Sequence, residues 1–560
     1  MGILDWGFYK LYGLGADLFY RKFVRDTERA GAVNRAVLHE ILSANASTQY
    51  GRLHGFAAIS RAEDYKQRVP LSGYQDFEPY IEEIAAGAEG ILTTEPVKYF
   101  GLSSGTTGRQ KRIPVTSKAS RIVNMNMMFF QHALLRHALP SARTEGKGLL
   151  LMNMLQSGAT GAGIPTGSGT SGGVKTMQKI VPYFWVSPLT VLQIADQPTA
   201  NYLHLLFALQ ERNLAYIGAP FPSAIVQLFA VLEEKGLELV RDVEQGRISE
   251  TLPLEPENRA LLEKGLRANP RRAAEVEREW AQGMQGIAQR LWPKMAYLSC
   301  VAGGPFSIYV ERLRHYGGGL PIYSAIYGAT EAVIGLAAEL DVAQYVVSPR
   351  AAYYEFIPLQ ESDAAQPLTL DVDEVEVGRD YEIVLTSHAG FYRYRLGDVV
   401  RVVGRCGQAP ILEFCYRKGQ LLNLAGEKTS EAALTFALQA AALALEAIVS
   451  DFSVVEDLDG SPCRYKVFLE VRQPEGLRKG SGNLRDTLES ALCEANPRYR
   501  AGLEAKRLGP LKLVFVRQGT FQAIRRELIE RGASQNQVKI PRLVRDVELL
   551  AILEANAEEE

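Results

Sequence analysis

The feature that most constrains the fold is the alternation of short apolar runs with longer amphipathic segments between residues 148 and 326. Three runs predict strands, at 148–152, 215–218 and 295–300. Helix-like segments separate them, at 200–212 and at about 224–291. Strands connected by helices usually lie parallel in one sheet, with the helices packed on its faces. We therefore predict a layered α/β core with mostly parallel strands.

The pattern changes twice further along the chain. From about 350 to 415, closely spaced apolar runs separated by Gly and Pro predict an antiparallel, barrel-like portion. After about 420 a helix, two strands, a helix, a strand and a further helix form a compact α+β unit, long enough to fold alone. We predict a large N-terminal domain, residues 1–418, and a small, mobile C-terminal domain, residues 419–560. The polar run 417–420 is the predicted hinge.

Residues 1–45 are predicted to be helical. Apolar side chains recur at helical spacing, at Leu11, Leu14, Leu18 and Phe19. Such a stripe normally packs on a core, so we expect this face to be buried.

The composition of the chain argues against several classes of binding partner. A formal net charge of -2 over 560 residues argues against nucleic acid or an anionic membrane as the partner of the whole chain. The five cysteines contain no Cys-x-x-Cys pair, which predicts neither a disulfide framework nor a zinc site and favours a cytoplasmic protein. The N-terminus shows no export or lipidation pattern, and polar residues interrupt the apolar stretch 432–449. We expect no membrane partner and a monomer that binds small molecules.

One short run has the composition of a phosphate site. It reads Ser103-Ser104-Gly105-Thr106-Thr107-Gly108-Arg109-Gln110-Lys111, and apolar runs flank it on both sides. Backbone N–H groups in such a strand-to-strand turn can form an anion nest, to which the hydroxyls and the Lys111 ammonium add donors and charge. The run differs from the usual nucleoside-triphosphate loop, in which Lys directly follows Gly. The alternative is a Ser/Gly/Thr surface turn.

A second glycine-rich stretch, 158–173, contains a run that matches the dinucleotide fingerprint by letter, at 167–172. The fingerprint needs a strand leading directly into the first glycine, and Pro165 interrupts the approach. We therefore predict a mobile loop, placed over a substrate pocket.

Three further clusters follow strand-like runs. They are Ala302-Gly303-Gly304-Pro305, Tyr327-Gly328-Ala329-Thr330-Glu331 and Tyr392-Arg393-Tyr394-Arg395-Leu396-Gly397-Asp398. Paired glycines allow a flat ligand to approach the backbone, an aromatic ring can stack on a base, and carboxylates can bind Mg²⁺ or the hydroxyls of a ribose. The alternatives are structural: Glu331 caps a helix, or Asp398 pairs with Arg393 or Arg395.

At these residues the chain resembles the adenylate-forming superfamily that includes acyl-CoA synthetases and firefly luciferase. The three signatures occur in the same order: a Ser/Thr/Gly loop ending in lysine, Tyr-Gly-x-Thr-Glu and Tyr-Arg-x-Gly-Asp. More narrowly, the chain resembles the Gretchen Hagen family of acyl-acid amido synthetases, the auxin-responsive enzymes of plants and their bacterial relatives. That likeness rests on Tyr50-Gly51, on the doubled Tyr-Arg at 392–395 and on the run 537–542.

The resemblance implies a firefly luciferase-like fold, ATP and Mg²⁺ as cofactors, and a role for each matching residue. The ATP-binding residues would be Ser103, Ser104, Gly105, Thr106, Thr107, Lys111, Gly303, Gly304, Pro305, Tyr327, Gly328, Ala329, Thr330, Glu331, Asp398 and Arg417. Among them Gly303–Pro305 and Tyr327 would line the adenine pocket, Glu331 would also bind the metal, and Asp398 and Arg417 would bind the ribose. Lys539 would reach the α-phosphate and the carboxylate during adenylation, and Lys428 would be a second catalytic lysine near the phosphates.

The implied reaction joins a carboxylic acid to an amine, expected to be an amino acid. The acid attacks ATP to form an acyl-adenylate and pyrophosphate, and the amine then displaces AMP. Apolar and aromatic residues at 124–132 and 219–222 favour a hydrophobic or aromatic acid. No general base is evident, and we interpret the nearby His388 as structural. Two alternatives share the nucleotide site: an acyl-CoA ligase with a thiol acceptor, and a nucleotide-binding protein without turnover.

Overall fold

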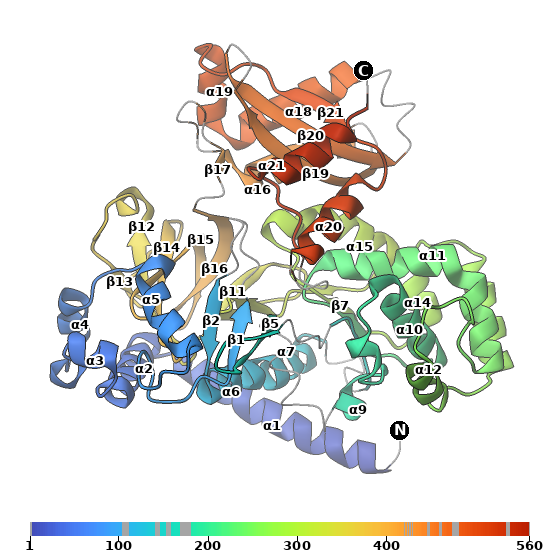
Figure 1. The fold of residues 1–560 in the computed structure, drawn as a ribbon, viewed down its shortest axis with the longest axis horizontal. Helices are drawn as coiled ribbons and strands as arrows, with labels where there is room; N and C mark the ends of the chain where they lie inside the picture. The colour runs from blue at the N-terminus through green and yellow to red at the C-terminus, as the bar shows by residue number, and fades with distance from the viewer. Residues whose placement is uncertain are drawn as a thin grey trace.

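The computed structural model describes residues 3–102, 111–139, 146–152, 158–168, 181–418, 421–422, 424, 427, 429–444, 448–458, 462–472, 481–531, 533 and 538–558 (Figure 1). The phosphate-loop residues Ser103, Ser104, Gly105, Thr106 and Thr107 lie outside this part of the chain, as does Lys428.

The chain begins with two helices, α1 (Ile3–Thr27) and α2 (Ala30–Asn45), as the sequence predicts. The expected packing face is wrong at three of its four positions: Leu11, Leu14 and Leu18 are 74%, 61% and 67% exposed, whereas Phe19 packs against the core. The aromatic side of α1 is turned inward instead: Tyr9 and Phe23 are buried, and Tyr12 contacts His132. Aromatic rings bury more apolar area than leucine, so they determine which side of the helix faces the core.

Several short helices follow. They are α3 (Gln49–Leu53), η1 (Phe56–Ala58), α4 (Ala62–Arg68), α5 (Tyr74–Ala85), α6 (Ser117–Met125), the π-helix η2 (Asn126–Phe130) and α7 (Gln131–Ala138). Together α6, η2 and α7 form one helical stretch from Ser117 to Ala138.

A parallel sheet forms the next layer. Its order is β3 (Leu149–Leu150), β6 (Tyr216–Gly218), β7 (Tyr297–Ser299) and β8 (Ile322–Tyr323), and every pairing is parallel, as predicted. The helices around it are α9 (Val181–Phe184), η3 (Val191–Gln193), α10 (Gln197–Gln210), α11 (Pro222–Gln245), α12 (Pro256–Glu263), α13 (Pro270–Trp280), α14 (Ile287–Leu291), η4 (Gly304–Tyr309) and α15 (Val310–Gly317). In Figure 1 they form the green lobe.

The strands on either side of the phosphate loop pair as predicted. β1 (Tyr99–Leu102) lies antiparallel to β2 (Arg112–Val115), with Leu102 opposite Arg112. The expectation of a loop over 158–173 is wrong in its first half. Residues there form β4 (Gly158–Ala159) and β5 (Pro165–Ser168), and β5 pairs in parallel with β1. Gly167 therefore lies within a strand, opposite Gly101.

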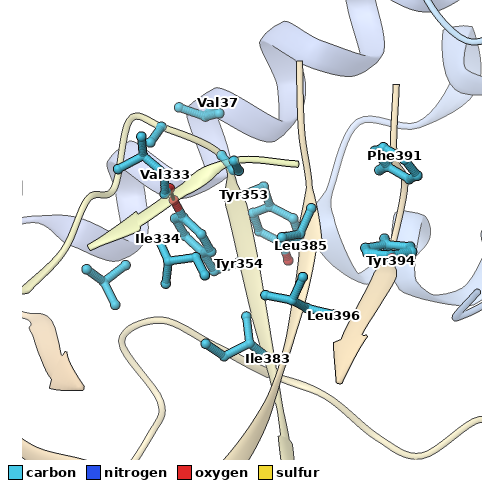
Figure 2. Close-up of a cluster of buried hydrophobic side chains, with 14 of the residues drawn as sticks. Val37, Val333, Ile334, Tyr353, Tyr354, Ile383, Leu385, Phe391, Tyr394 and Leu396 are labelled. Atoms are coloured by element: carbon cyan, nitrogen blue, oxygen red, sulfur yellow. Dashed lines mark hydrogen bonds between the residues drawn. The ribbon is translucent and has the colours of Figure 1, made fainter. Parts of the chain in front are cut away.

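The region near 330–417 is an eight-stranded antiparallel sheet, which confirms the predicted change from parallel to antiparallel strands. In spatial order its strands are β13 (Leu370–Asp371), β12 (Tyr353–Pro358), β14 (Asp380–Thr386), β15 (Tyr394–Cys406), β16 (Ala409–Arg417), β11 (Gln344–Val347), β10 (Val333–Ala337) and β9 (Ile326–Gly328), with η5 (Leu359–Glu361) after β12. Tyr353, Tyr354 and Leu385 of this sheet belong to the same cluster of buried apolar side chains as Val37 of α2 (Figure 2).

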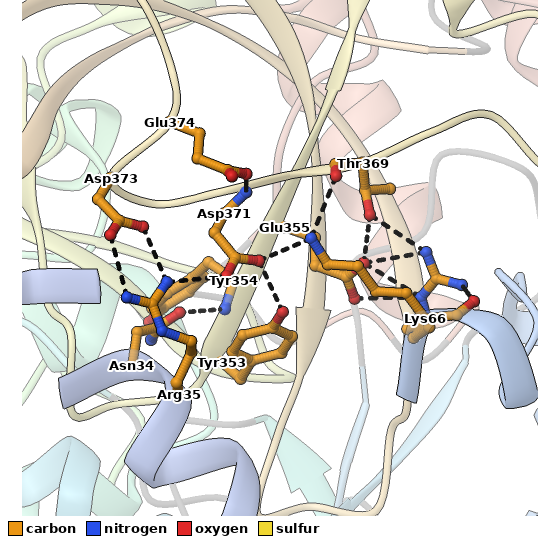
Figure 3. Close-up of polar contacts among 11 residues, drawn as sticks. Asn34, Arg35, Lys66, Tyr353, Tyr354, Glu355, Thr369, Asp371, Asp373 and Glu374 are labelled. Carbon is orange, nitrogen blue, oxygen red and sulfur yellow. Dashed lines mark hydrogen bonds and ion pairs between the residues drawn. The ribbon is translucent and has the colours of Figure 1, made fainter. Parts of the chain in front are cut away.

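A polar network fastens the same sheet to the helices. Asp371 forms ion pairs with Lys66 of α4 and Arg35 of α2, at 2.7 and 3.1 Å, and accepts a hydrogen bond from Tyr353 (Figure 3). Nearby, the buried Glu355 pairs with Arg393 at 2.9 Å. The two ion pairs of Asp371 link segments more than 300 residues apart in sequence.

Beyond residue 420 the elements match the predicted order. They are β17 (Leu421–Leu422), β18 (Thr429–Ser430), α16 (Glu431–Ala444), β19 (Ile448–Asp457), β20 (Arg464–Arg472), α18 (Ser481–Ala495), α19 (Pro497–Glu504), β21 (Lys512–Phe515), α20 (Thr520–Glu530) and α21 (Val547–Ala555). Two clusters of buried side chains belong to this part alone.

All five cysteines are free. Among the described helices, none is both long enough and apolar enough to cross a membrane.

Candidate active site

Three predicted site residues meet on the antiparallel sheet. Asp398 on β15 lies directly opposite Arg417 on β16, and the Arg417 Nε donates to Asp398 Oδ1 at 2.5 Å. The Tyr327 hydroxyl on β9 donates to Asp398 Oδ2 at 2.8 Å. Four strand spacings separate β9 from β15 in the sheet order, roughly 19 Å if the sheet were flat. The sheet must therefore curl to bring Tyr327 to Asp398.

The structural alternatives for these carboxylates are wrong. Arg393 pairs with Glu355 and Arg395 with Glu382, so neither arginine neutralises Asp398. Glu331 precedes strand β10 and not a helix, so it caps no helix.

Glu331 is a buried carboxylate surrounded by donors. It lies in the turn between β9 and β10, is 7% exposed and accepts a hydrogen bond from Tyr394. Burial raises its pKa, and the nearby charges of Arg417 and Lys111 oppose that rise. Lys111, just before β2, lies over the Tyr74 ring at 5.2 Å, and burial lowers its pKa. The last residue of the phosphate loop thus lies near the proposed metal ligand.

In the predicted adenine segment, Gly303–Pro305, neighbouring residues come too close to Gly303 and Gly304 to leave room for a larger side chain. A Cβ on Gly303 would lie 2.5 Å from that of Ala343. Gly304 has a φ of 57°, and a Cβ there would come within 3.0 Å of the Phe414 ring. Phe414 in turn meets the edge of Tyr327, with ring centroids 6.0 Å apart. Gly304 begins η4, and Phe414 contacts both this turn and the Tyr327 ring.

Lys539 reaches the same place from the C-terminal part. Its ammonium lies 5.5 Å from the ring centroid of Phe306 in η4 and 3.4 Å from the Glu431 carboxylate. Burial lowers the pKa of Lys539, and Glu431 opposes this effect. Arg417 is also close enough to influence the pKa of Lys539. Residues separated by more than 400 positions, from Lys111 to Lys539, therefore share one charged neighbourhood.

Sequence reasoning missed three residues of this neighbourhood. Phe306 and Phe414 lie against the adenine segment, and Glu431 is the partner of Lys539. The one sequence signal that could have identified Phe306 is that it directly follows the predicted site residues Gly303–Pro305. His388 lies elsewhere: burial lowers its pKa to about 4, and its charged neighbours are Lys118, Glu40 and Glu95. Its structural interpretation agrees with this placement.

The donor set fits a Mg²⁺ ion that is shared with a nucleotide. Magnesium is usually bound by one or two carboxylates together with substrate phosphates, and Glu331 supplies a buried carboxylate within electrostatic reach of Lys111. No cluster of three or more His, Cys, Asp or Glu residues suited to a metal occurs among the described residues, so a dedicated protein cage is not found there.

Solved structures match this architecture. A 2-hydroxyisobutyryl-CoA ligase in the postadenylation state superposes with a TM-score of 0.55 and 14% identity over 94% of this chain and 92% of that chain, which shows the fold of an adenylating ligase. A "GH3.15 acyl acid amido synthetase" superposes far better, with a TM-score of 0.85 and 30% identity over 95% of both chains.

The sequence comparisons identify the family. Models of the GH3 (Gretchen Hagen) family match its N-terminal domain at residues 19–322, its central domain at 345–417 and its C-terminal domain at 432–548. An indole-3-acetic acid-amido synthetase of Arabidopsis thaliana is 31% identical, and so is a jasmonoyl–L-amino acid synthetase of Nicotiana attenuata; each comparison covers 95% of both chains. The chain belongs to the GH3 family of acyl acid amido synthetases, which are ATP-dependent ligases.

Proposed function

We propose that this enzyme adenylates a hydrophobic or aromatic carboxylic acid with ATP and transfers the acyl group to an amino acid, with Lys539 as the catalytic lysine of the first step. The observation that carries the proposal is the position of Lys539. It lies against η4, which begins with the predicted adenine residues Gly304 and Pro305, and within electrostatic reach of Arg417. Lys539 nevertheless comes from a separately packed part of the chain.

In the first half-reaction a carboxylate oxygen of the acid attacks the α-phosphorus of ATP. A new P–O bond forms, and the bond to the bridging oxygen breaks to release pyrophosphate. No enzyme nucleophile is required, so the protein contributes alignment and charge neutralisation. Asp398 and Arg417 would hold the ribose, while the loop residues Ser103–Thr107, Lys111 and Lys539 would bind phosphate oxygens.

Magnesium at Glu331 would neutralise phosphate charge when bound. The protein groups around it have complementary tasks: Tyr394 donates to Glu331 and orients it, and Arg417 and Lys111 oppose the rise in its pKa that burial causes.

In the second half-reaction the amine nitrogen attacks the acyl carbonyl carbon. A C–N bond forms, the bond to AMP breaks, and the amine loses a proton. We further propose that residues 419–560 form a mobile domain that moves about a hinge at 417–420 between the two steps. Lys418 suits a pivot held on the large domain, because its ammonium donates to the carbonyl and hydroxyl oxygens of Ser362, both at 2.6 Å.

The character of the acid is inferred from the walls beside Lys539. Phe221, in the predicted pocket segment 219–222, stacks on Phe306 with ring centroids 4.8 Å apart, and Lys539 lies near the same Phe306 ring. An aromatic pair next to the catalytic ammonium suits an acid whose carboxylate is attached to an apolar or aromatic body.

A substrate screen tests the proposal. Pyrophosphate release from ATP is measured with a panel of aliphatic, indolic, benzoic and phenoxy acids, each with and without the twenty amino acids. We expect acid-dependent release, and an amide product when an amino acid is added. Release without amide but with a thioester from coenzyme A would contradict the amine acceptor, and no release with any acid would contradict adenylation.

A further inference from the structure

Two cations of the C-terminal part, Lys539 and Arg542, each lie over an aromatic ring of η4. Lys539 lies over Phe306, and three residues further along each segment the Arg542 guanidinium lies over the Tyr309 ring, 6.0 Å from its centroid. Phe306 and Tyr309 are one turn apart in the 3₁₀-helix η4, where side chains at i and i+3 lie one above the other. The spacing of the two cations thus matches the spacing of the two rings.

At the contact between Arg542 and Tyr309, the carboxylate of Asp451 bonds to both residues. Asp451 of β19 accepts a hydrogen bond from the Tyr309 hydroxyl at 2.9 Å through Oδ2. Its Oδ1 accepts hydrogen bonds from Arg542 and from the Phe452 backbone N–H. Tyr309 and Arg542 are 7% and 3% exposed, so water competes little for these bonds. This is a hydrogen-bonded contact between the two parts of the protein, made outside the predicted nucleotide ligands.

Arg542 and Asp451 are fixed to each other within the C-terminal part. Arg542 also donates to the Phe452 carbonyl at 2.8 Å and packs on the Phe452 ring at 4.6 Å. The intervening Pro541 accepts a hydrogen bond from Ser453 at 2.6 Å. Only Ile540 and Pro541 separate Arg542 from Lys539, a span of at most roughly 10 Å. Anchoring Arg542 therefore restricts where the Lys539 ammonium can lie.

We propose that Tyr309, Asp451 and Arg542 form a docking latch, a set of positioning residues that holds the C-terminal part on η4 and so places Lys539 for the first half-reaction. This inference rests on the proposed adenylating role of Lys539. It adds residues that touch neither ATP nor the acid and act only through the position of that lysine. The latch must open if the C-terminal part moves for the second half-reaction, so its loss affects the two steps differently.

The Tyr309 hydroxyl is the most selective place to test the latch. Burial, and then the Asp451 carboxylate, raise the pKa of Tyr309, so the phenol stays protonated and donates throughout the neutral range. Tyr309→Phe removes this one donor and keeps the ring beneath Arg542. A matched control is Tyr202→Phe, because the Tyr202 hydroxyl donates to the buried Asp242 at the same 2.9 Å, entirely within the N-terminal part.

The two half-reactions are then measured separately in the full-length enzyme. The first is acid-dependent exchange of pyrophosphate into ATP, and the second is amide formation from a supplied acyl-adenylate. A hydrogen bond to a charged group justifies an expected loss of about tenfold or more in the first step. The second step should be unchanged or faster in Tyr309→Phe, and Tyr202→Phe should leave the ratio of the two rates as it is.

Small-angle X-ray scattering adds a readout that needs no turnover. Tyr309→Phe should increase the radius of gyration of the ligand-free enzyme, while Tyr202→Phe should not. Equal losses in both half-reactions, an unchanged first step, or a radius of gyration equal to that of the parent would each overturn the latch. If the parent enzyme releases no pyrophosphate with any acid, the proposed function fails separately, and scattering alone decides whether the docking contact exists.

Discussion

At the scale of single residues, the charge of Lys539 is set by two opposing influences. Burial lowers its pKa and Glu431 raises it again. If the cationic form is needed, adenylation falls as the pH rises through this pKa. Glu431→Gln removes the raising influence, so the decline should begin at a lower pH than in the parent. The measurement is kcat/KM for acid-dependent pyrophosphate release between pH 6 and 10, since kcat/KM reports the free enzyme.

Lys539→Arg supplies the control for this prediction. Arginine stays protonated throughout that range, so any alkaline decline caused by Lys539 should disappear, whatever the remaining rate. An alkaline limb at the same pH in the parent and in Glu431→Gln would show that Glu431 does not control the lysine.

Asp398 is the residue on which the proposed ribose contact depends. Asp398→Asn leaves the shape of the side chain but removes its charge and one acceptor, although Tyr327 and Arg417 still point to it. Charged hydrogen bonds contribute about 1.5–3 kcal/mol, so the Kd for ATP should rise about 10-fold or more. Calorimetric titration with ATP measures this.

A matched aspartate pair on the same sheet provides the comparison. Asp380 on β14 accepts from the Arg401 Nε at 2.7 Å and faces its partner across neighbouring strands, as Asp398 does, but it is more exposed. Asp380→Asn should leave the ATP affinity unchanged. Equal affinities in Asp398→Asn and the parent would contradict the ribose contact.

At the scale of secondary-structure elements, the pair Arg393–Glu355 holds β15 to β12 and to the end of α4. Arg393 donates to Glu355 at 2.9 Å and to the carbonyl oxygens of Lys66 and Val69 at 2.6 and 2.9 Å. Arg393→Met leaves Glu355, which is fully buried, without its cation. Removing one partner of a buried ion pair costs about 3–5 kcal/mol. The urea unfolding midpoint, followed by circular dichroism, should fall accordingly.

The double variant Arg393→Met with Glu355→Leu distinguishes this cause from a loss of packing. Replacing both charges with apolar side chains removes the unpaired carboxylate, so the midpoint should recover most of the loss. A double variant less stable than Arg393→Met alone would show that the pair itself, and not the stranded charge, stabilises the sheet.

Element order was the most predictable property of this chain. The strands flanking the phosphate loop, at 99–102 and 112–115, lie where apolar runs stop at polar turns, because such local signals set the ends of strands. Burial was less predictable. Leu11, Leu14 and Leu18 have ideal helical spacing yet face outward, because periodicity identifies a stripe without saying whether another face of the helix is more apolar.

The residues of the candidate site were likewise predictable only in part. Asp398, Arg417 and Lys539 could be chosen because each belongs to a motif with a recognisable order. Glu431 could not, since its contact with Lys539 joins the start of α16 to a segment over 100 residues later and depends on how the small part packs. Arg393 looked like a partner for Asp398 because it is close in sequence, but its guanidinium pairs with Glu355 instead.

At the scale of the whole molecule, the groups proposed to bind ATP and the lysine proposed to act on it belong to different parts of the chain. Tyr327, Glu331, Asp398 and Arg417 all precede residue 418, and their contacts with one another do not include the C-terminal part. Lys539 is contributed from the other side of the junction, against Phe306. Binding and catalysis should therefore be separable by cutting the chain at the proposed boundary.

A chain of residues 1–418 should bind ATP with an affinity close to that of the full-length protein, because the proposed ribose and metal ligands remain. It should lose acid-dependent pyrophosphate release by at least about 100-fold, the cost typical of removing one charge-stabilising group. Calorimetry and a pyrophosphate assay measure the two properties, and circular dichroism confirms that the shortened chain is folded. A folded 1–418 chain that still adenylates would exclude Lys539 as the catalytic lysine. A folded chain that no longer binds ATP would show that the C-terminal part helps to form the nucleotide site and does not merely deliver the lysine.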